Sequence, residues 1–453
     1  MPLRDLLITG ILATTLPFVF RHVFIGVLLW TWISIMNPHK LAYGFTQNAP
    51  IAAVVAAVTI VALMTTKDRV KPMLPSPLLF ATMFLIWTCV TTAFAFFTAE
   101  SLVDLNRFFK IMLMVLISAA VLYKREHIRL FIWVTVLSLG FYGLKGGIYT
   151  ILTGGGGRVW GPPGGFIEGN NEVALALIVT IPLMNFLRLT SPYKWVRRGL
   201  LAMMLLSAVA AAGSQSRGAF LAIAAMGTFM WWRAPNKLPG AVVGVLAALS
   251  ILAFMPQTWH ERMNTIGTYE EDGSAMGRIY AWQTAINVAN DRIVGAGYAM
   301  YSPDVFVIYY PRNSSGRFDP SVARAAHSIY FQVLGEHGYV GLFLFVMIWV
   351  CAWRAGGRLR RGTRDGPETS WLYHYGSMAQ VSLVGYAVGG AFLSLAYFDL
   401  PYNVVIALVV AERWRAEHKT IGEHASLAPI GNPRAVHLGL PFGARVVRWI
   451  RTA

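Results

Sequence analysis

Residues 324–350 read RAAHSIYFQVLGEHGYVGLFLFVMIWV, a segment in which a charged start leads into a long apolar run. Arg324 and His327 stand at the entrance of this run, about one helical turn apart. The apolar run beginning at His327 is long enough to cross a hydrocarbon core of about 30 Å as a helix. The segment therefore predicts a membrane-crossing helix that has a fixed positive charge and a titratable base at its entrance.

The composition places the whole chain in a membrane. Hydrophobic residues make up 56% of the 453 residues and charged residues only 13%, with a mean hydropathy of +0.54. Soluble domains carry roughly 25% charged residues, so this chain cannot cover a water-facing surface. The net charge of +17 falls on short connections, which indicates the positive-inside bias rather than nucleic-acid binding. Cys89 and Cys351 lie in apolar runs and predict no disulfide framework.

Twelve apolar runs, most of them roughly 16–25 residues long, predict the crossings. They occupy residues 5–36, 48–66, 76–98, 103–123, 127–152, 172–190, 198–213, 217–232, 238–256, 327–353, 371–397 and 400–413. The first run is too long for one straight helix and is broken by Pro17, Arg21 and His22, so residues 1–36 cross either once or twice. We expect an all-α polytopic integral membrane protein with about twelve transmembrane helices, forming a single membrane domain over residues 1–453.

The Lys/Arg clusters predict the orientation of these crossings. Dense basic connections are found at 67–71, 124–129, 194–198, 233–237, 354–364 and 413–419. They fall on alternate connections, which is the pattern of loops that all face the cytoplasm. The remaining connections then face outward, and they are 99–107, 153–171, 214–217, 257–326 and 397–400. We expect a multi-pass membrane protein whose large connection, 257–326, is extracytoplasmic.

Residues 257–326 form the one large outward connection, an insert between the ninth and tenth crossings. Its length exceeds that of a passive connector. Within it, residues 276–292 place Ile279, Trp282, Ile286 and Ala289 at helical spacing, which predicts an amphipathic helix lying along the membrane face. The glycine-rich segment 153–166 is no P-loop, because no Gly-Lys-Ser/Thr follows it, and we interpret it as a lid.

Five chemically active side chains belong to the outward connections or helix mouths, namely Arg158, Arg217, Arg278, Arg324 and His327. Arginines on this side run against the positive-inside bias, and their planar donor forks suit phosphate oxygens. A histidine at a helix N-terminus is kept neutral by the positive end of the helix dipole, and a neutral imidazole accepts a proton. The pattern favours an anionic ligand held by arginines beside a general base.

Each of these residues also has a purely structural interpretation. His327 can cap or pack at the membrane interface, and Arg217 can snorkel there. Arg278 can form a cation–π pair with Trp282 one turn later, and Arg158 in the glycine-rich segment is the weakest candidate. Gly335, Gly338 and Gly341 predict close helix packing, with His337 as a packing residue between them.

Metal and hydrolase chemistry have little support in the sequence. It contains neither an HExxH motif nor a Cys/His cluster, and the run Glu270, Glu271 and Asp272 is typical of a solvated turn. Ser328 adjoins His327 without a nucleophile elbow. We therefore expect a site that contains no metal or cofactor.

Three stretches in order resemble the bacterial O-antigen ligase/polymerase superfamily, which includes protein O-oligosaccharyltransferases. They are 214-SQSRGAF-220, 278-RIYAWQTAINVANDRIVGAGYAMY-301 and 327-HSIYFQVLGEHGYVG-341. The last is similar to the histidine signature of that superfamily, and the resemblance covers roughly residues 150–400. It implies a helical membrane bundle with a periplasmic cap, which transfers a glycan from undecaprenyl pyrophosphate without metal or nucleotide.

Transferred residue by residue, the resemblance implies that His327 is the catalytic base and that Arg217 and Arg278 hold the pyrophosphate, with Arg158 as an additional candidate. The expected partners are the lipid-linked glycan donor, the lipid A–core acceptor and membrane lipid. The activity that the resemblance implies is O-antigen ligation in lipopolysaccharide biosynthesis, by a multi-pass protein of the bacterial inner (cytoplasmic) membrane whose active site faces the periplasm. A polymerase or a protein O-oligosaccharyltransferase of the same superfamily is the alternative, and a lipid-linked glycan transporter is a further one.

Overall fold

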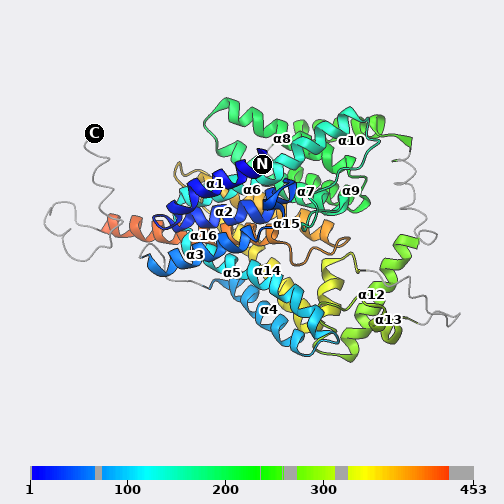
Figure 1. The fold of residues 1–453 in the computed structure, drawn as a ribbon. Helices are drawn as coiled ribbons and strands as arrows, with labels where there is room; N and C mark the ends of the chain where they lie inside the picture. The colour runs from blue at the N-terminus through cyan, green and yellow to red at the C-terminus, as the bar shows by residue number, and fades with distance from the viewer. Residues whose placement is uncertain are drawn as a thin grey trace.

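The computed structural model describes residues 3–66, 74–234, 236–257, 259, 273–311 and 325–427. These residues form α-helices and two short 3-10 helices, and no strand is found among them. Most helices run roughly parallel to one long direction of the molecule, with α12 and α13 at the opposite end from the last turns of α16 (Figure 1). The all-α expectation is confirmed.

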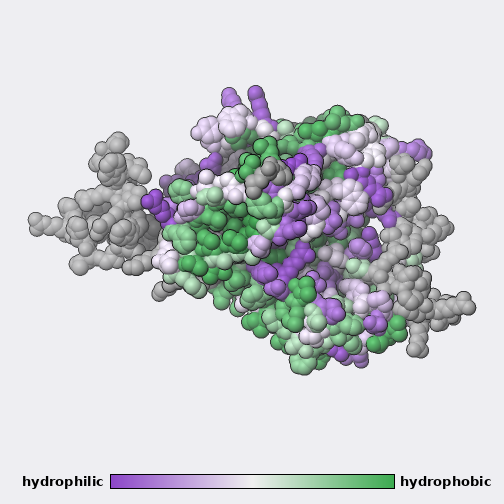
Figure 2. Space-filling model, viewed as in Figure 1, coloured by the Kyte–Doolittle hydropathy of each residue, from purple (hydrophilic) through white to green (hydrophobic). Residues whose placement is uncertain are grey.

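The described α-helices are α1 (Leu3–Val19), α2 (Val23–Met36), α3 (Ile51–Thr65), α4 (Ser76–Ala93), α5 (Thr98–Val121), α6 (Arg125–Leu152), α7 (Asn170–Thr190), α8 (Lys194–Gly213), α9 (Arg217–Arg233), α10 (Lys237–Phe254), α12 (Gly273–Asp291), α13 (Pro303–Tyr309), α14 (Ile329–Arg360), α15 (Ser370–Gly390) and α16 (Asp399–Leu427). Apart from α12 and α13, which belong to the predicted insert 257–326, the described helices follow the predicted apolar runs in chain order, and the first run holds both α1 and α2. Among the residues searched, five helices are long and apolar enough to cross a membrane: α4, α6, α7, α8 and α14. Apolar surface covers the α1–α3 region and meets hydrophilic surface along its border (Figure 2). The chain is therefore a multi-pass membrane protein.

Residues 3–36 fold as a hairpin of two helices rather than as one long helix. Arg4 in α1 donates a hydrogen bond to the Leu41 carbonyl beyond α2, at 2.5 Å. The Asp5 carboxylate accepts one from the Thr46 backbone N–H at 3.0 Å. The start of α1 therefore lies beside the end of α2, which makes the two helices antiparallel.

The basic connections gather at one end of the helix bundle. The Arg358 guanidinium forms an ion pair with Glu412 at 2.6 Å, which joins the end of α14 to α16. Arg233 and Arg360 both donate to the Gln380 side chain, at 2.5 and 3.3 Å, so the end of α9 meets α14 and α15 at this same end. The predicted basic connections 233–237, 354–364 and 413–419 thus lie together. Connection 67–71 lies outside the described residues. We call this region the basic end.

The predicted helix at 276–292 is confirmed as α12, and it packs closely on the first part of α14. Ala285 is 0% exposed at this contact, and Ala281 and Val288 are also buried. A Cβ atom on Gly335 of α14 would lie only 3.1 Å from the Ala285 Cβ. Small side chains on both helices allow this approach. Ile286, by contrast, is 36% exposed and lies away from this contact.

Helix α14 bends at Gly338, which has φ 67° and ψ −172°. A Cβ atom here would lie 2.1 Å from the Ile293 carbonyl oxygen, so the bend brings α14 against the chain that follows α12. The Trp87 indole N–H donates to the His337 carbonyl at 2.9 Å. His337 is fully buried, and its Nδ1 pairs with the Thr91 hydroxyl at 2.7 Å. The packing interpretation of the glycines and of His337 is therefore confirmed, and Gly338 also makes the bend.

We expect Gly338→Ala to destabilise the protein much more than Gly362→Ala. Both glycines have positive φ, 67° and 69°, so both substitutions strain the backbone. Only Gly338 adds a collision with backbone, because nothing lies within 4 Å of a Cβ atom on Gly362. Thermal unfolding of the two purified variants in detergent measures the difference, and equal melting temperatures would contradict the account.

Candidate functional site

Arg217 follows the α8–α9 turn, whose polar residues are buried. Gln215 has φ 57°, which reverses the chain within the turn. Ser214 and Ser216 are buried, and the Ser216 hydroxyl caps α9 by accepting from the Ala219 N–H at 3.2 Å. A serine cap of this kind satisfies one of the unpaired N–H groups that begin a helix. Arg217 is consequently fixed as the first residue of α9.

The glycine-rich segment that was interpreted as a lid is bonded to this same turn. Arg158 Nε donates to the Gln215 side-chain oxygen at 3.3 Å, and the Gln215 amide donates to the Gly155 carbonyl at 3.2 Å. Asn170, the first residue of α7, donates to the Ser214 carbonyl at 2.8 Å. Arg158 therefore lies beside the turn that precedes Arg217.

Arg278 lies on α12, whose next turn is anchored to the segment that precedes α14. The Trp282 indole N–H donates to the Ala326 carbonyl at 2.7 Å, and its ring stacks on Phe331 with the centroids 4.8 Å apart. Trp282 thus contacts the chain on both sides of His327. Arg278 itself interacts electrostatically with the Glu172 carboxylate in the first turn of α7. It is therefore linked both to the α7 start and to the His327 segment.

His327 lies just outside α14 rather than inside it. The helix begins at Ile329 with Ser328 as its N-cap, so His327 immediately precedes the cap. Its φ of 44° is uncommon for a residue other than glycine. Its neighbours Ala326 and Ser328 are 0% and 1% exposed, so the surrounding structure holds this backbone in place. Backbone conformations of this kind cost about 1–3 kcal/mol and cluster at functional sites.

The end of α15 and the residues just beyond it pack against the first turns of α7, α9 and α14. A Cβ atom on Gly390 would lie 2.6 Å from the Ile329 Cδ1, next to His327. A Cβ atom on Gly218, next to Arg217, would lie 2.9 Å from the Phe392 Cβ just beyond α15. Gly389 approaches Leu175 of α7 in the same way. The structure thus brings Arg158, Arg217, Arg278 and His327 to one end of the bundle, which we call the arginine end; Arg324 lies outside the described residues.

Two residues of this end were not singled out from the sequence. Glu172 supplies the carboxylate beside Arg278, and Gln215 joins Arg158 to the α8–α9 turn. Glutamate in the first turn of a helix is common for reasons of helix stability alone, so its position gave no functional signal. Within the described ranges, no group of three or more His, Cys, Asp or Glu side chains lies together in a way that would hold a metal ion. Glu270, Glu271 and Asp272 lie outside those ranges.

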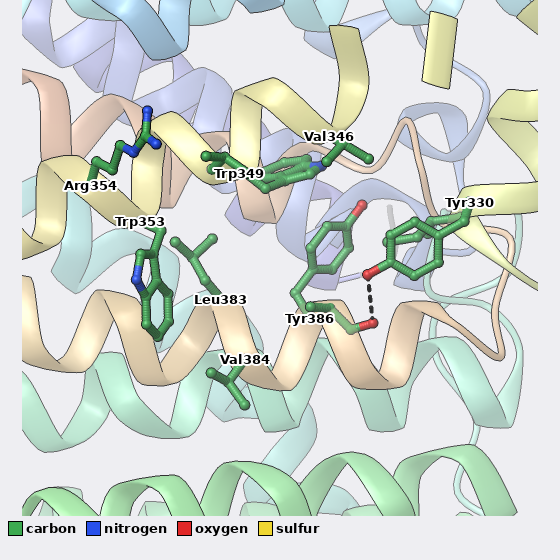
Figure 3. A pocket seen from close by; sticks show the side chains of 11 residues that line it. Tyr330, Val346, Trp349, Trp353, Arg354, Leu383, Val384 and Tyr386 are labelled. Atoms are coloured by element: carbon green, nitrogen blue, oxygen red, sulfur yellow. Dashed lines mark hydrogen bonds between the residues drawn. The ribbon is translucent and has the colours of Figure 1, made fainter. Parts of the chain in front are cut away.

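An apolar groove leads away from the arginine end between α14 and α15. It has a volume of about 270 Å³ and runs from Ile329 and Tyr330 to Trp353 and Arg354. Figure 3 shows Tyr330 and Tyr386 at one end of it and Trp353 with Arg354 at the other. The Tyr330 hydroxyl donates to the Ala387 carbonyl at 2.9 Å, which joins the two helices where the groove begins. The groove therefore connects the neighbourhood of His327 with the basic end.

Two family models match this chain. Residues 202–346 match the model described as O-antigen ligase, and residues 3–191 match a family of unknown function. No curated protein matches the sequence. The first match contains Arg217, Arg278 and His327, whereas Arg158 and Glu172 fall within the second. The arginine end is therefore assembled from both matched segments.

We expect Trp282→Phe to loosen the backbone around His327 while the fold persists. Phenylalanine keeps a ring to stack on Phe331 but cannot donate to the Ala326 carbonyl, a loss of about 1 kcal/mol. Hydrogen exchange of the peptide containing residues 325–329 should quicken. Trp231→Phe is the matched control, because the Trp231 indole donates to the Lys237 carbonyl at 2.8 Å beside the basic end. Equal exchange in both variants would contradict the anchoring role.

Proposed function

We propose that this chain, which carries an O-antigen ligase domain over residues 202–346, transfers a glycan from undecaprenyl pyrophosphate to a sugar hydroxyl of lipid A–core. The observation that supports this best is the convergence of Arg217, Arg278 and the His327 segment at one end of the bundle, opposite the basic end. By the positive-inside bias, the basic end would face the cytoplasm and the arginine end the periplasm of the inner membrane. The lipid-linked glycan donor would be used there.

The arginines would serve the leaving group. When the glycosidic bond breaks, the bonding electrons remain with the diphosphate oxygen and its negative charge grows. Arg217 is held at the start of α9, and Arg278 is held on the anchored helix α12. Guanidinium groups fixed in this way need little reorganisation to stabilise that charge. Arg217 begins α9 behind a buried serine cap, and Arg278 lies one turn from the anchored Trp282. Both therefore fit a role in holding the pyrophosphate, with Arg158 beside them.

His327 would act on the acceptor. Its imidazole takes the proton of the acceptor hydroxyl while the hydroxyl oxygen bonds to the anomeric carbon and the bond from that carbon to the diphosphate oxygen breaks. A single displacement of this kind inverts the anomeric configuration. General-base assistance of this type contributes roughly 10²–10⁴-fold. His327 has a positive φ and immediately precedes the N-cap of α14, so it stands at the mouth of that helix.

The groove between α14 and α15 would receive the polyprenyl chain of the donor. Its lining is almost entirely apolar, it begins at Ile329 beside the His327 segment, and it extends toward the basic end. A donor whose diphosphate lay against the arginines would therefore find an apolar path for its tail along the bilayer. Arg354 lines the far end of this path.

An O-antigen polymerase or a protein O-oligosaccharyltransferase would use the same arrangement with a different acceptor. Incubation of the purified protein with lipid-linked donor, and either lipid A–core or no second acceptor, separates ligation from polymerisation. Product mass should show one glycan joined to lipid A–core, and extension of the donor glycan in its absence would assign polymerisation instead. A transporter would move the donor across a bilayer without forming a new glycosidic bond.

We expect His327→Asn to abolish transfer while leaving the protein folded. Asparagine tolerates positive φ and keeps hydrogen-bonding groups, but it is not a base at neutral pH. The transfer rate should fall at least roughly 10²-fold, with donor affinity nearly unchanged. Wild-type transfer by this variant, shown to be folded by its thermal melt, would eliminate His327 as the base.

We expect Arg278→Lys to slow transfer strongly, because one ammonium group cannot reproduce the two-pronged contact of a guanidinium with phosphate oxygens. Arg129→Lys makes the same chemical change in the first part of α6, where Arg129 lies near Thr190 at the end of α7, and serves as the control. The loss should appear in transfer from the pyrophosphate donor for Arg278→Lys alone. Equal rates in both variants would contradict a role for Arg278 at the diphosphate.

A further inference from the structure

A second groove lies on another side of the bundle, between α2, α3 and α5. Its volume of about 570 Å³ is larger than that of the groove between α14 and α15, and the two have no lining residue in common. Gly165 and Phe166, from the segment that also carries Arg158, complete its rim. The function proposed above does not use this groove.

The lining of the second groove changes from polar to apolar along its length. Asn37, Asn106, Arg107 and Lys110 line the part nearest the 153–169 segment, where Asn37 also lies close to Gly165. Trp30, Ile60 and Leu113 line the part that runs along the helices away from that segment. A ligand matched to this surface has an anionic head at the arginine end and an apolar body directed into the bilayer.

The two cations of the groove are placed differently. The Arg107 guanidinium lies over the Phe166 ring, 3.6 Å from its centroid, and interacts electrostatically with Asp104 and Asp399. Neither of these acids lines the groove, and no Asp or Glu occurs among its described lining residues. Arg107 and Lys110 are therefore the charged side chains among the described residues that line the groove.

Lys110 is an exposed cation to which the described part of the chain offers no hydrogen bond or ion pair. It lies midway along α5, at the point where the polar first half of that helix gives way to the apolar run that begins at Ile111. Ionisable groups in membrane helices are costly and usually mark a ligand or a pathway. A lipid phosphate would supply both the counter-charge and the hydrogen-bond acceptors.

The α3 wall of the groove is built from small side chains. Ala52, Ala53, Ala56 and Ala57 recur on one face of α3 and all line the groove. Alanines leave room between α3 and α5 that larger residues would fill. The α3 wall thus provides an apolar surface for hydrocarbon chains in the same groove as Arg107 and Lys110.

We propose that this second groove seats the phosphorylated glycolipid that accepts the glycan, with its phosphate against Arg107 and Lys110 and its acyl chains along the alanines of α3. The assignment as acceptor rests on the proposed function. The 153–169 segment connects the two regions, because it bonds to Gln215 through Gly155 and Arg158 and contacts Arg107 through Phe166. A transferase that joins two lipid-borne molecules needs two lipid-binding sites, and the groove between α14 and α15 and this second groove would provide them.

The test compares the wild-type protein with the double variant Arg107→Gln/Lys110→Gln. Native mass spectrometry of the purified full chain with lipid A, phosphatidylglycerol and undecaprenyl phosphate measures lipid binding directly. The affinity for lipid A should fall roughly tenfold or more in the variant, because each charge-assisted contact contributes substantially. In transfer assays, the KM for lipid A–core should rise by a similar factor, while the KM for the lipid-linked donor stays unchanged.

Two further variants complete the test. Arg197→Gln/Arg198→Gln removes two exposed cations from the start of α8, near the basic end, and should leave both affinities unchanged. Ala53→Phe/Ala57→Phe fills the groove without altering its charge and should also weaken lipid A binding. Unchanged lipid A binding in both groove variants would overturn the proposal.

The outcomes also separate this inference from the proposed function. Equal weakening of phosphatidylglycerol and lipid A, with an unchanged acceptor KM, would show a bound structural phospholipid and overturn the acceptor role. Weakening of undecaprenyl phosphate alone would reassign the groove to the donor. If no acceptor supports transfer, the proposed function fails while the binding measurements still decide whether a phosphorylated glycolipid occupies the groove.

Discussion

Backbone that leaves the helical conformation inside a membrane protein must find its hydrogen bonds within the protein or from water. This constraint shapes the arginine end of the chain. The turn at Gln215, the 153–169 segment and the residues before α14 all leave helical geometry, and each is bonded to a neighbouring element. The same bonds that satisfy the irregular backbone fix the positions of the charged side chains.

The positions of the cations divide the molecule functionally. Arginines and lysines of the basic end pair with Glu412, Gln380 and helix carbonyls, as expected of residues that set orientation and stabilise helix ends. At the arginine end, one carboxylate, that of Glu172, accompanies Arg278. One groove begins at Ile329 next to the His327 segment, the other includes Gly165 and Phe166 of the 153–169 segment, and each has an apolar body. This arrangement suits a reaction between two amphiphiles at a membrane boundary.

Much of the architecture could be predicted because hydrophobic runs and Lys/Arg clusters are local signals. They placed the helices, the grouping of the basic connections and the helix now seen as α12. The hairpin of α1 and α2 stayed an alternative, because a break at Arg21 and His22 is compatible with either one or two crossings. The count of about twelve crossings remains a prediction, since five helices within the described residues meet the length and hydropathy expected of a span.

The candidate site was predictable in its residue types but not in its connections. Arg217, Arg278 and His327 stood out because charged residues on that side oppose a strong compositional bias. Glu172, Gln215 and the stacking of Arg107 on Phe166 depend on contacts between segments far apart in the chain, and no local pattern encodes them. The positive φ of His327 was likewise invisible, because histidine carries no sequence signal for that conformation.

The most direct test of the central claim is an experimental structure of the protein in a lipid nanodisc with undecaprenyl pyrophosphate bound. We predict that the diphosphate lies against the guanidinium groups of Arg217 and Arg278, with the His327 imidazole facing the same cavity and the polyprenyl chain entering the groove between α14 and α15. A diphosphate held elsewhere, or an imidazole opening onto a separate cavity, would contradict the account.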